Sequence, residues 1–170
     1  MGIPTYRTRV TRTVRRRGVT PDISLAAHCA ATELLARTPL LVRRGPYVLA
    51  AWAPAQISAV CQGLLRCRTG HGVVILDELE ASALLPEHAL AEMPPARHVQ
   101  RGFALITLGT PMEWDVTGVL AAVSGALADA GVPLGAAAAF SRDHLFVPVD
   151  RLDDALAALQ PLCAEVRVLA

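Results

Sequence analysis

Residues 103–169 alternate short apolar runs with two helical patterns, and this alternation constrains the fold more than any other feature of the chain. Apolar residues recur at helical spacing over 116–130 and 151–160, which predicts two amphipathic helices. Runs of strand length lie at 103–108, 132–140, 145–149 and 165–169. The predicted order is therefore strand, helix, strand, strand, helix, strand.

The first half of the chain repeats most of that order. Strands are predicted at 40–42, 47–52, 73–76 and 81–85, and a helix is predicted from Pro54 to about Gly70. A right-handed split unit of this kind forms a four-stranded antiparallel sheet with helices on one face. The sequence therefore predicts an α+β protein made of tandem ferredoxin-like (βαββαβ) units.

Charge divides the chain into an N-terminal arm and a remainder. Residues 1–44 carry nine Arg against two acids, a net charge of +7, whereas residues 45–170 carry −6. We expect a basic arm with a short helix at 24–37 over residues 1–45, a degenerate first unit at 46–101 and a complete unit at 102–170. Six arginines in the first 17 residues would attract phosphates, so a nucleic-acid-linked effector module is one alternative function. We consider nucleic acid the weaker expectation, because no helix-turn-helix pattern is present.

One uncharged stretch, 45–65, is long enough to cross a bilayer. Pro46 and Pro54 interrupt it, and a buried strand followed by an amphipathic helix explains it better. The four cysteines lack metal-binding spacing, which favours free thiols in a reducing compartment. We therefore expect a cytoplasmic protein with no membrane partner.

The loop and helix start at 109–120 read Gly-Thr-Pro-Met-Glu-Trp-Asp-Val-Thr-Gly-Val-Leu. This stretch resembles the Gly-Pro-Leu-Asp-Phe-x-Leu-Thr-Gly-Ile-Leu pattern of ACT domains, above all those of the cytosolic arginine sensors and small bacterial tandem-ACT proteins. Residues 130–135 and 143–147 also resemble the strands that follow in that family. The resemblance covers 102–170 well and 46–101 weakly.

The resemblance implies a small regulatory protein that binds an amino acid, without catalysis, and that forms a homo-oligomer. The unpaired amides of a helix N-terminus suit a ligand carboxylate. Asp115 or Thr117 is expected to cap this helix, and Asp115 or Asp143 could pair with a ligand cation. The candidate ligand-binding residues are Asp115, Val116, Thr117, Gly118, Val119 and Asp143. The chain has no GxSxG, HExxH, Walker or GxGxxG motif, and we assign it no catalytic residue, metal or cofactor.

Two departures weaken the expected ligand contacts. Ala138 and Ala139 stand where the family pattern has Ser-Thr, and His144 replaces a Tyr. The ACT-like unit at 102–170 could therefore bind a different amino acid, or serve as an assembly module that has lost its ligand. Both readings stay open at this point.

Overall fold

The computed structural model describes residues 30–67 and 71–169, which form one seven-stranded sheet. The strand order is β2-β3-β1-β4-β6-β5, and β7 pairs in parallel with β1. The strands are β1 (Pro39–Trp52), β2 (Val73–Leu76), β3 (Ala81–Pro86), β4 (His98–Leu108), β5 (Gly135–Ala138), β6 (Asp143–Pro148) and β7 (Glu165–Val168). The α-helices are α2 (Ile57–Cys67), α3 (Val119–Asp129) and α4 (Leu152–Leu159), preceded by a helical segment at 30–36.

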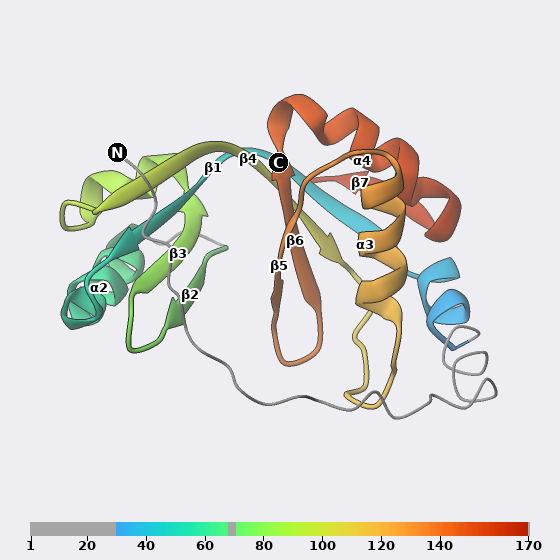
Figure 1. Ribbon diagram of the computed structural model, residues 1–170, viewed down its shortest axis with the longest axis horizontal. Coiled ribbons are helices and arrows are strands. Elements are labelled where there is room, and N and C mark those ends of the chain that lie inside the picture. The colour runs from blue at the N-terminus through green and yellow to red at the C-terminus, as the bar shows by residue number, and fades with distance from the viewer. Residues whose placement is uncertain (1–29, 68–70, 170) are drawn as a thin grey trace, which may run out of the picture.

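Two long strands, β1 and β4, run through both halves of the sheet (Figure 1). The first half of β1 pairs with the end of β4 from Leu40 opposite Leu108, and its second half pairs with the start of β4 up to Ala51 opposite His98. The prediction of two separate strands at 40–42 and 47–52 is therefore wrong. The domain boundaries predicted after residues 45 and 101 fall inside these two continuous strands.

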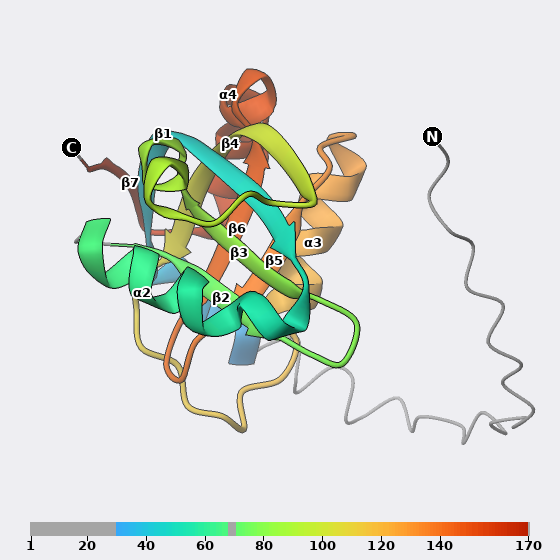
Figure 2. The ribbon, with the colours of Figure 1, turned by 90° about the vertical axis from the view of Figure 1, so that its left-hand side faces the viewer.

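Helices α2, α3 and α4 pack on one face of the sheet, as predicted. Leu40 and Val42 of β1 join a core with α3 and α4, while Val48, Ala50 and Trp52 join a second core with α2. Figure 2 shows α2 lying across the strands of its own half. On the opposite face, Leu84 of one half and Leu105 and Phe146 of the other share a single apolar cluster, so both helix-covered cores lie on the same side of the sheet. The predicted α+β class with antiparallel pairing and helices on one face is confirmed.

Other predicted elements are present in the structure, but their first or last residues differ from the prediction. Helix α3 begins at Val119, three residues after the predicted start, because Gly118 adopts a left-handed conformation with φ of 92°. Strand β5 covers only Gly135–Ala138 of the predicted run at 132–140. Of the helix predicted at 24–37, residues 30–36 are helical and the rest of its start lies outside the described residues.

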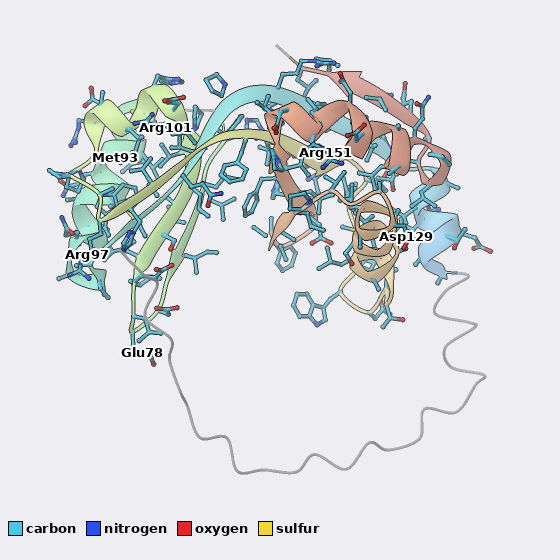
Figure 3. All side chains as sticks on the ribbon, turned by 45° about the horizontal axis from the view of Figure 1, so that its top comes forward. Glu78, Met93, Arg97, Arg101, Asp129 and Arg151 are labelled. Atoms are coloured by element: carbon cyan, nitrogen blue, oxygen red, sulfur yellow. The ribbon has the colours of Figure 1, made fainter. Side chains whose placement is uncertain are left out.

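The far end of α3 is closed by an arginine of the neighbouring segment. Arg151, which is labelled in Figure 3, donates hydrogen bonds to the carbonyl oxygens of Gly131 and Ala130. Gly131, with φ of 65°, donates its backbone N–H to Ala128, as expected for the glycine after a helix end. In residues 30–67 and 71–169, no helix is long and apolar enough to span a bilayer.

Candidate functional site

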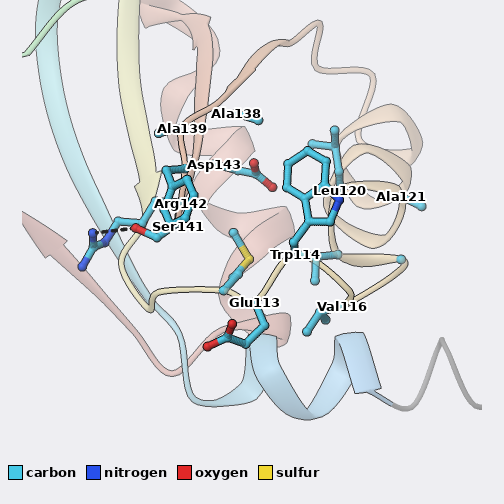
Figure 4. Close-up of a pocket in the computed structure, with 14 residues that line it drawn as sticks. Glu113, Trp114, Val116, Leu120, Ala121, Ala138, Ala139, Ser141, Arg142 and Asp143 are labelled. Carbon is cyan, nitrogen blue, oxygen red and sulfur yellow. Dashed lines mark hydrogen bonds between the residues drawn. The ribbon is translucent and has the colours of Figure 1, made fainter.

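The loop between β4 and α3 and the turn between β5 and β6 enclose a cavity of about 220 Å³ (Figure 4). Two hydrogen bonds hold these segments together. The backbone N–H of Met112 donates to the carbonyl oxygen of Ser141 at 2.8 Å, and Nε of Arg142 donates to the carbonyl oxygen of Gly109 at 3.1 Å. The cavity therefore has a floor built from segments that lie about 30 residues apart in the sequence.

The start of α3 opens into this cavity without a capping side chain. Gly118 occupies the N-cap position and has no side chain to accept a hydrogen bond. Its carbonyl oxygen accepts from Ala122, which leaves the amides of the first turn without intrahelical acceptors. Gly118, Val119, Leu120 and Ala121 all line the cavity. The arrangement presents backbone donors and a partial positive charge to a small anion.

Asp143 stands on the opposite wall, at the start of β6. Figure 4 shows it between the β5–β6 turn and the start of α3. Burial raises the pKa of its carboxyl group, and the nearby His144 opposes this in part. Above that raised pKa the carboxylate carries a half-buried negative charge, which suits a cationic partner.

Two aromatic side chains stand at the cavity's rim. Trp114 is 91% exposed and Phe140 is 99% exposed, although both line the cavity. Leu120 is 42% exposed and lines the same cavity. Large apolar side chains gathered at an exposed site are typical of a surface that a ligand or partner covers.

The structure brings together four of the six predicted site residues. Val116, Gly118, Val119 and Asp143 line the cavity, whereas Asp115 and Thr117 are exposed and lie outside its lining. The prediction that Asp115 or Thr117 caps α3 is wrong, because Gly118 is the N-cap and no side chain bonds to this helix end.

Five polar or aromatic residues of the cavity were missed by sequence reasoning: Glu113, Trp114, Phe140, Ser141 and Arg142. A signal for Glu113 was present, since it aligns with the Asp of the family pattern when the Thr-Gly pairs are superposed. Arg142 gave no such signal, because it reaches the site only through the hairpin that pairs β5 with β6.

Residues 98–161 match the family model for the ACT domain. No curated protein matches the sequence. Among solved structures, a protein from Agrobacterium tumefaciens superposes with a TM-score of 0.63 at 21% identity, covering 79% of this chain and 95% of that one.

Two aspartate kinase structures are similar as well. The regulatory subunit of aspartate kinase from Thermus thermophilus, in its ligand-free form, has a TM-score of 0.57 at 14% identity over 75% of this chain and 98% of that one. E. coli aspartokinase III, solved in complex with aspartate and ADP, has a TM-score of 0.54 at 18% identity over 72% of this chain and 32% of that one. These likenesses show a shared fold, and the fold is the ACT-type arrangement predicted from the sequence.

Proposed function

We propose that the protein is a non-catalytic regulatory protein that binds a free amino acid at the start of α3, because residues 98–161 match the family model for the ACT domain. The similar regulatory subunit of aspartate kinase is consistent with a regulatory role. The predicted closeness to the cytosolic arginine sensors stays a prediction. In this proposal, residues 46–101 are a degenerate second ACT-like unit that shares β1 and β4 with the first.

One observation carries the proposal: an uncapped helix N-terminus and a half-buried carboxylate face the same cavity. The backbone amides of Val119 to Ala121 are donors for the carboxylate of an amino acid. Asp143 provides the negative charge that pairs with its ammonium group. A zwitterion needs both features, and neither a simple anion nor a simple cation does.

The apolar residues of the cavity indicate which kind of ligand side chain would fit. Met112, Val116, Ala138 and Ala139 are apolar, and the alanines replace the hydroxyl residues of the family pattern. A polar ligand side chain buried against these groups would lose hydrogen bonds to water without replacement. We therefore expect small aliphatic amino acids to bind more tightly than arginine.

A thermal-shift screen of the twenty amino acids tests the proposal, because a ligand that binds only the folded state raises the unfolding midpoint. Asp143→Asn is expected to remove the response, with a loss of affinity of tenfold or more, about the effect of one charge-assisted hydrogen bond. Asp115→Asn is the matched control and should respond like the wild type, since Asp115 lies outside the cavity. If no amino acid raises the midpoint, the ligand-free assembly module becomes the better reading.

A second copy of the chain is proposed to cover the open side of this cavity. Trp114 and Phe140 together present two aromatic side chains to solvent at its rim. Sedimentation velocity should show a dimer that the double change Trp114→Ala and Phe140→Ala converts to monomer. A wild-type chain that sediments as a monomer at high concentration contradicts this part of the proposal.

The nucleic-acid alternative rests on the Arg-rich residues 1–17, which lie outside the described residues. It requires salt-sensitive DNA binding that disappears when residues 1–19 are deleted. Within the proposal we place the protein in the cytoplasm, in keeping with an exposed free thiol at Cys61.

A further inference from the structure

A second cavity, of about 150 Å³, lies on the sheet face that the α-helices leave uncovered. Both halves of the sheet contribute to it. The lining residues are Tyr47, His71, Gly72, Val73, Leu84, Leu105 and His144. Tyr47, Leu84 and Leu105 belong to the apolar cluster on this face, so the cavity has a packed base and a polar wall.

Arg43 places an unsatisfied positive charge beside this cavity. It lies on β1 directly opposite Leu105 of the cavity wall. Its Nη1 is buried and is the one buried side-chain nitrogen or oxygen in the described part of the chain that has no hydrogen-bond partner. Buried guanidinium nitrogens are normally paired, because leaving one unpaired costs free energy. Nη1 of Arg43 is therefore a donor that is available to a ligand.

The charge of Arg43 acts electrostatically on three residues of the cavity wall. It lowers the pKa of Tyr47 against the larger, opposite effect of burial, and it adds to burial in lowering the pKa of His71 and His144. Tyr47, His71 and His144 line one cavity, and Arg43 lies on β1 opposite another residue of its lining, Leu105. No carboxylate lines this cavity among the described residues.

Each polar side chain of the wall can donate a hydrogen bond. Burial raises the pKa of Tyr47, which keeps its hydroxyl protonated at neutral pH. Nδ1 of His144 is 3.0 Å from the hydroxyl oxygen of the buried Thr107, which leaves Nε2 for another partner. His71 faces the same space from the segment before β2. Asp143 and Arg142 are the other charged groups that act on His144, with opposite effects on its pKa.

We propose that this cavity binds a small oxyanion, a phosphate or a carboxylate group, through Arg43 with Tyr47, His71 and His144 as further donors. The volume suits an ion of a few heavy atoms, since a water molecule occupies about 30 Å³ in the liquid. The site is separate from the cavity at the start of α3 and takes no part in the amino-acid binding proposed there.

Titration with inorganic phosphate at pH 7 and constant ionic strength tests the site, with the unfolding midpoint and calorimetric affinity as readouts. The wild type and Arg44→Gln should bind phosphate alike, because Arg44 is exposed and forms an ion pair with Asp153 at 3.6 Å. Arg43→Met should weaken binding by tenfold or more, the effect of one lost charged hydrogen bond. Without phosphate, Arg43→Met should unfold at the same or a higher temperature, since it removes an unpaired buried group.

Titration with acetate in parallel distinguishes the two sources of the anion. Binding of phosphate alone identifies a phosphoryl site, and binding of both identifies a general oxyanion site. In the wild type, NMR titration should show that the bound anion raises the pKa of His71 and His144. The proposal is wrong if neither anion binds, if Arg43→Met binds as tightly as the wild type, or if both histidine pKa values stay unchanged.

Discussion

At the scale of residues, Asp143 and His144 show how one strand serves two faces. They are neighbours on β6, so their side chains point to opposite sides of the sheet. Asp143 lines the cavity at the start of α3, and His144 lines the cavity on the uncovered face. Burial is the main cause of both shifts, raising the pKa of Asp143 and lowering that of His144.

The lowered pKa of His144 predicts a loss of stability on acidification. The unfolded chain binds a proton at the ordinary pKa of about 6.5, whereas the folded chain does so only at lower pH. Between the folded-state pKa and the unfolded-state pKa of His144, the unfolded state binds more protons. The free energy of unfolding therefore falls as the pH decreases through this range. His71, whose pKa is also lowered, adds to the slope.

Urea unfolding at pH 7 and pH 5 measures this slope. His144→Gln should show a smaller decrease than the wild type, and Gln can still bond the hydroxyl of Thr107. The exposed His98→Gln is the matched control. An unchanged slope in His144→Gln would mean that His144 is not protonated on unfolding in this range. Asp143 acts at lower pH with the opposite sign, because its raised pKa makes the folded state bind the extra proton.

Cysteine reactivity follows burial in the same way. Burial raises the pKa of Cys163 to about 11, so at pH 8 about one thiol in a thousand is the reactive thiolate. Cys61 is exposed. Iodoacetamide should therefore alkylate Cys61 first and Cys163 far more slowly, as followed by mass spectrometry. In urea the two rates should converge, and rapid native labelling of Cys163 would contradict its burial.

At the scale of elements, β1 continues through both halves of the sheet with a shift of its pairing register against β4 in its middle. Between Arg43 and Tyr47 it advances four residues while β4 advances two, from Leu105 to Phe103. Gly45 absorbs the extra length with φ of 90°, a conformation that other residues adopt at a cost. A second shift follows, since β1 advances one residue from Tyr47 to Val48 while β4 advances two, from Phe103 to Arg101. Val42 before these shifts and Val48 after them both pack in the helix-covered cores.

Gly45→Ala should therefore be strongly destabilising. A Cβ at this position would lie 2.5 Å from the carbonyl oxygen of Phe103, a backbone atom that cannot move aside. Gly102→Ala is the matched control, since its φ of 84° is similar and nothing lies within 4 Å of its Cβ. We expect about 1–2 kcal/mol for Gly102→Ala and roughly 1–3 kcal/mol more for Gly45→Ala, measured by urea unfolding. Equal losses would mean that β1 relaxes away from Phe103.

At the scale of the whole molecule, neither half of the sheet is complete by itself. The first half of β1 lies between β4 and β7, and β7 pairs with no other strand among the described residues. Leu40 and Val42, both fully buried, supply the centre of the core under α3 and α4. The segment that matches the ACT family model begins at residue 98, so it does not include Leu40, Val42 or any other part of β1.

A fragment of residues 98–170 should consequently fail to fold cooperatively. It would expose an edge of β4, leave β7 without a partner and lose the burial of Leu40 and Val42, about 1.5–3 kcal/mol for each side chain. Circular dichroism during heating should show a broad transition for the fragment and a sharp one for the full chain. A sharp transition in the fragment would show that the two halves are independent after all.

Four of the six residues predicted from the sequence line the same cavity, because the candidate site is built largely from one loop and the helix after it. The Thr-Gly pattern located Gly118 and Val119, and the start of the next hairpin located Asp143. The sequence-based prediction included Asp115 and not Glu113, because a helix-cap preference does not say which side chains of a loop face inward. The loop's hydrogen bond to Ser141 settles that orientation, and it joins segments distant in sequence.

The sequence by itself determined the class of fold and the positions of the helices and of most strands, because these follow from hydrophobic periodicity over a few neighbouring residues. Only the tertiary structure decided that β1 and β4 join both halves into one sheet, and that Arg43, His71 and His144 meet on its uncovered face. Strand pairing depends on contacts between residues far apart in the chain. Local patterns carry no information about which distant partner a strand will choose.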